Sequence, residues 1–213
     1  MADGNSLIPI NDEQAKLIQE VLKTIRGLGS FFEKALGSTP EDLFGYLGGD
    51  WLRVRRAENI AKMMSCAKER LEARGVKDTK PASLTLALPI LRGAADESRE
   101  ELRDLWARLL AAAMDPYREK DIRLGFAEAI QKMDPLDARV LVHISNREAG
   151  ISDPERNNVS TELGVSLDEL SVSLSNLEKI GMAVVLHPLN QPMLRLNTVI
   201  TPFGREFIRV LMD

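Results

Sequence analysis

Apolar residues recur every three to four positions along most of the chain, and this period predicts a mostly helical protein. The first helical segment spans residues 12–36, and a second spans residues 51–74 and ends at Gly75. Between them, a capping hydroxyl and a proline precede a short helix that we expect around residues 43–47. The apolar stripe of the second segment predicts its buried face: Leu52, Ala57, Ile60, Ala61, Met64, Ala67 and Leu71.

Three more helices follow. The helix over residues 82–92 is expected to bend or break at its internal proline. The next helix is capped by Asp96 or Ser98, and Ser98 with Glu101 fits a capping box. It has the sharpest periodicity in the chain, with Leu102, Leu105, Trp106, Leu109, Leu110 and Ala113 on one face. A further helix over residues 121–132 is expected to bury Ile122, Phe126, Ala129, Ile130 and Met133.

From residue 134 onward the pattern changes to short helices and two β-prone segments. Asp134 and Pro135 mark the start of a helix, and a loop over residues 150–158 follows it. Gly164 supplies the tight turn between a short helix and a long one. The long helix spans residues 167–180 and is expected to bury Leu167, Leu170, Leu174, Leu177 and Ile180. A β-hairpin and a final helix complete the order of a winged helix-turn-helix module.

The predicted fold is therefore mostly α, with an N-terminal helical bundle and a C-terminal winged helix-turn-helix-like α+β module that has one β-hairpin. We divide the chain into a flexible N-terminus (residues 1–11), a helical domain (12–133) and a C-terminal module (134–213). The longest apolar run, residues 84–91, is too short to span a bilayer, and the start lacks the pattern of a secretory signal. A single cysteine fits a reducing compartment, so we expect a cytoplasmic protein.

Charge is distributed unevenly along the chain. Residues 1–133 carry 21 basic and 21 acidic residues, whereas the C-terminal module carries 7 basic and 11 acidic residues. In DNA-binding modules of this kind, the long helix presents arginine, lysine or amide side chains to the bases. Here the candidate contact face of that helix comprises Asp168, Glu169, Ser173, Asn176 and Glu178. Because carboxylates are repelled by phosphate, this face favours a protein partner or self-association over nucleic acid.

The helix over residues 51–74 is the most basic segment. Its bases, together with one in the hairpin, form a second candidate contact set, for nucleic acid or another partner: Arg53, Arg55, Arg56, Lys62, Arg70 and Arg195. The alternative interpretation is a solvated helix face whose bases pair partly with acidic residues of the segment 97–104.

Residues 28–51 combine aromatic side chains with five glycines. This segment could insert into a membrane interface or mediate oligomerisation. The alternative is a helical hairpin that packs on the core.

No residue pattern indicates a catalytic site, a cofactor site or a metal site, and no small-molecule substrate is evident. His143 and His187 have no ligand partners at metal-binding spacing, and Cys66 has no neighbouring base. The sequence contains no glycine-rich phosphate loop and no nucleophile elbow. We therefore expect a protein that is not an enzyme.

Several segments together resemble the Abi-alpha family, bacterial domains associated with abortive infection. The resemblance covers roughly residues 45–210 and is carried by GDWLR (49–53), RAEN (56–59), PIL (89–91), AADE (94–97), ELRDLWARLL (101–110), MDPLDA (133–138) and ITPFG (200–204). It implies a role in phage defence by analogy and no catalytic residues.

Three hypotheses for the function follow. The first is a non-enzymatic interaction protein in phage defence that acts through protein–protein contacts. The second is a winged-helix transcriptional regulator that binds DNA. The third is a membrane-active effector that uses residues 28–51.

Overall fold

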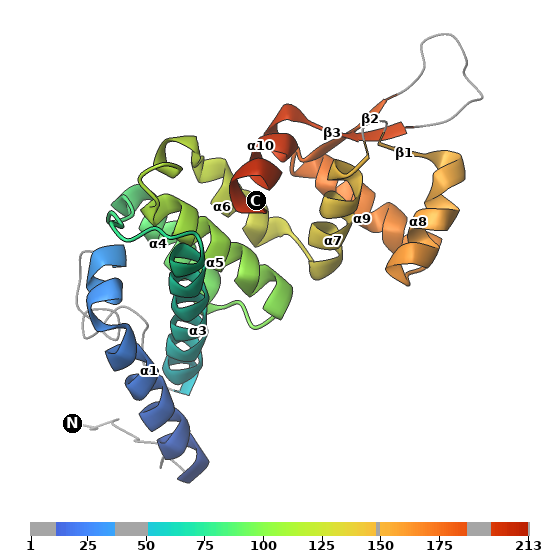
Figure 1. Ribbon diagram of the computed structural model, residues 1–213. Coiled ribbons are helices and arrows are strands. Elements are labelled where there is room, and N and C mark those ends of the chain that lie inside the picture. Colours follow the sequence, from blue (N-terminus) through green and yellow to red (C-terminus); the bar gives the residue numbers. More distant parts are fainter. Residues whose placement is uncertain (1–11, 37–50, 148–149, 187–196, 213) are drawn as a thin grey trace, which may run out of the picture.

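The computed structural model describes residues 12–36, 51–147, 150–186 and 197–212 (Figure 1). The N-terminal part contains α1 (Asp12–Leu36), α3 (Trp51–Ala73), α4 (Leu84–Ala95), α5 (Glu100–Met114), η1 (Glu119–Asp121) and α6 (Leu124–Lys132). The C-terminal module contains α7 (Pro135–Ser145), β1 (Ile151–Ser152), η2 (Asp153–Glu155), α8 (Arg156–Leu163), α9 (Leu167–Lys179), β2 (Ala183–Leu186), β3 (Asn197–Ile200) and α10 (Pro202–Leu211). The prediction of a mostly helical protein with a small sheet is confirmed. The predicted N-terminal tail, the helix at 43–47 and the hairpin loop lie outside the described residues.

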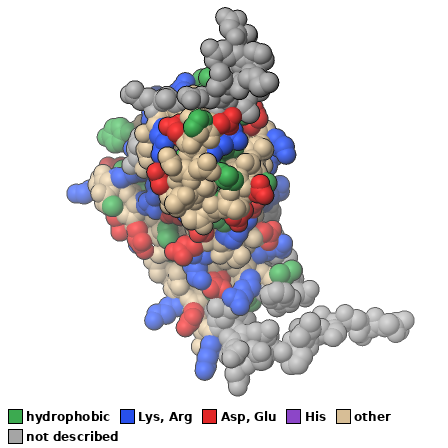
Figure 2. All heavy atoms as spheres, turned by 90° about the vertical axis from the view of Figure 1, so that its right-hand side faces the viewer, with side chains coloured by type: hydrophobic (Ala, Val, Ile, Leu, Met, Phe, Trp, Pro, Cys, Tyr) green, Lys and Arg blue, Asp and Glu red, His purple; other side chains and the backbone are tan. Residues whose placement is uncertain are grey.

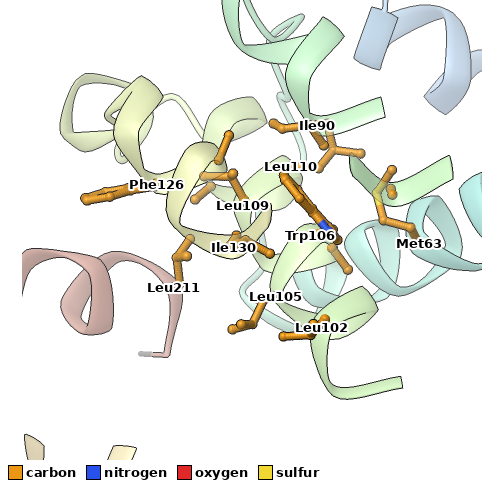
Figure 3. Packing of buried hydrophobic residues seen from close by; sticks show 14 of the residues in the cluster. Met63, Ile90, Leu102, Leu105, Trp106, Leu109, Leu110, Phe126, Ile130 and Leu211 are labelled. Atoms are coloured by element: carbon orange, nitrogen blue, oxygen red, sulfur yellow. The ribbon is translucent and has the colours of Figure 1, made fainter. Parts of the chain in front are cut away.

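Helix α5 is the centre of the core. All six apolar residues predicted for its inner face are buried, and so are Ala107, Ala111, Ala112 and Met114, so its second half is buried all round. Side chains of α3, α4, α6 and α10 surround it (Figure 3). Trp106 packs so closely on α4 that a Cβ at Gly93 would lie 2.2 Å from the indole ring. Only glycine allows this crossing of α4 and α5.

The corner between α4 and α5 differs from the prediction. Helix α4 does not break at Pro89 but continues to Ala95, so of the two predicted outcomes, a bend or a break, the break is wrong. The predicted capping box of Ser98 and Glu101 is wrong. Helix α5 begins at Glu100, and the Arg99 amide before it donates to Glu97 Oε1 at 2.8 Å.

Two leucines predicted in buried faces are exposed. Leu52 is 46% exposed and Leu167 is 45% exposed. Both lie in the first turn of their helices, where the helix has not yet reached the surface on which it packs. In contrast, Met63 is completely buried in α3, although it falls outside the predicted stripe.

The sheet of the C-terminal module has three strands in the order β1-β3-β2, and both pairings are antiparallel. Strand β1 is an addition to the predicted hairpin and lies in the segment expected to be a loop; α8 also begins earlier than expected, at Arg156. A Cβ at Gly150 would lie 2.3 Å from the Thr198 carbonyl oxygen. The φ angle of Gly150 is 74°, in the left-handed region. Glycine therefore permits β1 to lie against β3.

The two parts share one core. Phe126 of α6 packs against Phe203 and Phe207 of α10, with ring centroids 5.3 and 5.5 Å apart. Buried apolar residues form a continuous cluster from α1 to α10. The predicted boundary at residue 134 thus separates two parts of the chain that are packed on each other, and α10 lies between them (Figure 1).

Candidate functional site

Helix α9 is held against α7 by apolar and polar contacts. Leu170, Leu174 and Leu177 are buried beneath it. Ser173 and Asn176, which the sequence placed on the candidate contact face, point inward instead: the Ser173 hydroxyl donates to Asp137 Oδ1 and the Asn176 amide to Asp137 Oδ2, both at 2.6 Å. These two residues therefore fix the position of α9.

Asp137 is the acceptor at the centre of this arrangement. Its carboxylate is 2% exposed and also accepts a hydrogen bond from the Asp134 amide at 2.7 Å, as part of the capping box of α7. Asn176 donates a second hydrogen bond to the Lys132 carbonyl at 2.9 Å. The side chains of α9 thus bind the junction between α6 and α7 and orient the helix on the rest of the molecule.

The outer face of α9 is open. We define it by its exposed residues on the side opposite the core: Asp168, Val172, Ser175 and Lys179. Val172 is 70% exposed and lies in the middle of this stripe. Sequence analysis did not single out Val172, although its position opposite Leu170 and Leu174 on a helical wheel identifies it.

Two further acidic residues border the outer face. Glu169 is exposed and accepts hydrogen bonds from the Ser166 amide and hydroxyl, which lower its pKa. These contacts form a capping box at the start of α9. Glu178 is exposed and accepts from the Val185 amide at 3.2 Å, so it links α9 to β2. Negative charge therefore flanks Val172 toward both ends of the helix.

The arginines in and between α7 and α8 are engaged with neighbouring groups. Arg147 is paired with Glu155 and Glu162, and Arg156 lies 3.0 Å from Asp153. Arg139 donates to the Leu163 carbonyl at 2.6 Å. Seen from the side of α8, acidic and basic side chains are interspersed around a largely uncharged surface (Figure 2). Such a surface offers little net attraction to a phosphate backbone.

The basic helix α3 is largely neutralised. Glu58 lies 3.1 Å from Arg55 and 2.6 Å from Lys62, and although burial alone would raise its pKa, these hydrogen bonds lower it. Arg56 pairs with Asp96 at 2.6 Å, and Arg70 pairs with Asp104. The interpretation of a paired, solvated face therefore fits the described bases. The side chain of Arg53 and the whole of Arg195 lie outside the described residues.

The segment proposed for membrane contact is described only in part. Leu28 and Phe31 are 6% and 8% exposed and belong to the core cluster, while residues 37–50 lie outside the described part of the chain. Among the described residues, no helix is long and apolar enough to cross a bilayer.

Reactive side chains are dispersed. In the described part of the chain, no three histidine, cysteine or acidic residues gather as metal ligands would. His143 lies 3.3 Å from Glu162, and burial raises the pKa of Cys66. A cysteine with a raised pKa holds little of the reactive thiolate at neutral pH.

Comparison with known proteins yields one informative result. A family model described as abortive infection alpha matches residues 55–211, which include every helix from α4 to α10. No curated protein and no solved structure matches the chain.

Proposed function

Because the chain belongs to the abortive infection alpha family, we propose that it acts in abortive infection as a non-enzymatic interaction protein, which binds a protein partner through the outer face of α9. The observation that carries this proposal is the composition of that face. It presents an apolar centre, Val172, between exposed Asp168 and Lys179, with Glu169 and Glu178 at its borders, on a helix that is held from beneath by buried contacts. Protein interfaces combine such an apolar centre with a polar rim.

The charge of the face indicates the kind of partner. The exposed residues of α9 include three acids and one base: Asp168, Glu169, Glu178 and Lys179. A partner that presents arginine or lysine side chains around a small apolar contact would be complementary, and it would be attracted over long range at low salt. Self-association of the chain is tested separately, by measuring its oligomeric state in solution.

DNA binding is the competing function for this helix. In winged helix-turn-helix proteins that bind DNA, the helix in the position of α9 enters the major groove and supplies bidentate side chains. The acidic residues of α9 oppose this, and the amide of Asn176, which could read adenine, is occupied by Asp137 and the Lys132 carbonyl.

The test uses Val172→Arg in bacteria that express the full chain and are challenged with phage. A bulky cation at the centre of a contact surface is expected to reduce protection at least about fivefold, because loss of a central contact typically costs more than about 1 kcal/mol. The matched control is Leu84→Arg, which changes a 66% exposed apolar residue on α4. Protection by Val172→Arg that equals protection by the wild type would contradict the proposal.

Two measurements on the purified protein accompany this test. The unfolding temperatures of both variants show that they fold as the wild type does. Titration with duplex DNA at low salt tests the competing function: tight, salt-sensitive binding that Val172→Arg alters would assign the outer face of α9 to nucleic acid instead.

A further inference from the structure

Four arginines converge beside α5, near the C-terminal ends of α3 and α10. Arg70 lies in the last turn of α3, Arg74 follows directly after the end of that helix, Arg108 lies on α5, and Arg118 lies in the segment after α5. We refer to these residues as the arginine cluster. They are separated by up to 48 positions in the sequence, so no local sequence pattern predicts the cluster.

Three of the four arginines have clear structural partners. Asp104 accepts hydrogen bonds from Arg70 and, at 2.7 Å, from Arg108 Nε. Arg108 Nη1 and Arg118 Nη1 donate to the carbonyls of residues 211 and 210, at 3.0 and 3.1 Å. These contacts fasten the C-terminal end of α10 to α5, where cations interact favourably with the helix dipole.

Arg74 is different. Its Nη1 atom is buried and has no hydrogen-bond partner, and no described carboxylate lies within 4 Å of its guanidinium. Burial, followed by the proximity of Arg118, lowers its pKa. The Nε atom of Arg70 is likewise buried without an acceptor. A buried guanidinium nitrogen without an acceptor is unfavourable, so the described contacts leave part of the hydrogen-bonding capacity of Arg70 and Arg74 unused.

The charge balance of the cluster has the same implication. Asp115 is the described carboxylate that acts electrostatically on Arg74. The other carboxylate of the cluster, Asp104, is already bound by Arg70 and Arg108. Asp115 itself is 3% exposed and accepts the Tyr117 amide. Within the described part of the chain, two carboxylates thus face four guanidinium groups.

We propose that the arginine cluster binds the phosphate group of a small ligand. Guanidinium groups present planar pairs of N–H donors that match the oxygens of phosphate, and several of them at fixed positions are typical of phosphate recognition. The cluster is open to small solutes, because the side chains of Arg70 and Arg108 remain 30% and 21% exposed. It is independent of the contact surface on α9 and of the proposed function.

Arg74 is not needed to hold the C-terminal end of α10 in place. Arg108 and Arg118 already occupy the two carbonyls, and Asp104 is already bound by two arginines. Arg74 can therefore be replaced without removing a described contact. This makes Arg74→Gln the decisive variant, and Arg123→Gln, which removes an equal charge from an exposed position before α6, is its matched control.

The experiment measures thermal unfolding of the full chain in inorganic phosphate and in chloride of equal ionic strength. Above its dissociation constant, bound phosphate is expected to raise the unfolding temperature by about 3–5 °C for each tenfold increase in concentration. The wild type and Arg123→Gln should show this rise, and Arg74→Gln should lose it. Comparing the variants matters because phosphate also stabilises proteins non-specifically by exclusion from their surface, which would affect all three chains equally.

Two further arms complete the test. In chloride, Arg74→Gln should unfold at the same temperature as the wild type or slightly above it, because it removes a buried charge without an acceptor. Adenosine monophosphate is compared with adenosine: a stronger effect of the nucleotide than of free phosphate indicates a phosphate ester, and an equal effect indicates the free anion. An equal rise in all three chains, or a marked loss of stability of Arg74→Gln in chloride, would overturn the proposal.

Discussion

Replacing Asp137 by alanine removes the acceptor that joins α7 to α9. In the native structure its two carboxylate oxygens accept three hydrogen bonds, from the Ser173 hydroxyl, the Asn176 amide and the Asp134 main-chain amide. All three donor–acceptor distances lie between 2.6 and 2.7 Å. The carboxylate is 2% exposed, so water cannot replace it without rearrangement.

The three hydrogen bonds are not equivalent. Ser173 is buried, so its hydroxyl would be left unsatisfied, at a cost of about 1–3 kcal/mol. Asn176 keeps the Lys132 carbonyl as a second acceptor, and the Asp134 amide lies at a helix start, where losing the capping interaction costs about 1 kcal/mol. Removing the buried carboxylate also removes its desolvation cost, which offsets part of the summed loss of the three hydrogen bonds. We therefore expect Asp137→Ala to lower the free energy of unfolding by about 3 kcal/mol.

Urea denaturation measures this change, and thermal unfolding should show a decrease of about 6–12 °C for a chain of this size. Asp78→Ala is the control, because Asp78 is an exposed acid in the segment between α3 and α4 and its removal should change stability by less than about 0.5 kcal/mol. A cycle with Ser173→Ala isolates the pair, and we expect a coupling of about 1–2 kcal/mol. A coupling near zero, or an Asp137→Ala protein as stable as wild type, would refute the assignment of Asp137 as the acceptor that orients α9.

Four further predictions concern other parts of the fold. Gly93→Ala should destabilise the protein by at least about 2 kcal/mol in urea denaturation, because its Cβ would overlap the Trp106 ring. Gly164→Ala should cost only about 1 kcal/mol by the same measurement, because its φ of 67° is unfavourable for alanine but the surrounding space is open. Cys66 should react with iodoacetamide more slowly at pH 7.5 than a free cysteine does, because burial raises its pKa; an equal rate would contradict its partial burial. Asp104→Asn should lower stability by about 1 kcal/mol at pH 7. Burial would raise the pKa of Asp104, but the hydrogen bonds from its arginine partners outweigh burial and lower the pKa below its ordinary value of 3.8, so this difference should persist down to about pH 4 and vanish only as the pH falls further through the lowered pKa.

The sequence by itself determined where most helices begin and end. Asp134, Ser166 and Thr201 each precede a helix and satisfy its first amides, and Gly164 ends α8 with positive φ. These signals are local, since a cap and the amide it accepts are two or three residues apart. At Ser98 another local contact, from the Arg99 amide to the Glu97 carboxylate, replaced the expected capping box.

The sequence also established the family, because its motifs follow the helices of the core. The segment around Trp106 is the clearest example: it supplies the helix that every neighbouring element packs on (Figure 3). Apolar periodicity identifies such a helix because burial on one side imposes a regular spacing. Apolar periodicity does not identify the residue of the neighbouring helix on which such a side chain packs. The need for glycine at position 93 follows only from the packing of α4 on α5.

Tertiary structure alone decided which polar residues are available for binding. Ser173 and Asn176 have the same polarity as their exposed neighbour Ser175, but Asp137, 36 positions before Ser173, turns them inward. Strand β1 forms only because β3, almost 50 residues later, offers it an edge. The arginine cluster arises in the same way, from helices that meet through apolar burial. Hydrogen bonds and ion pairs between distant segments depend on that packing. The local spacing of residues in the sequence therefore does not predict them.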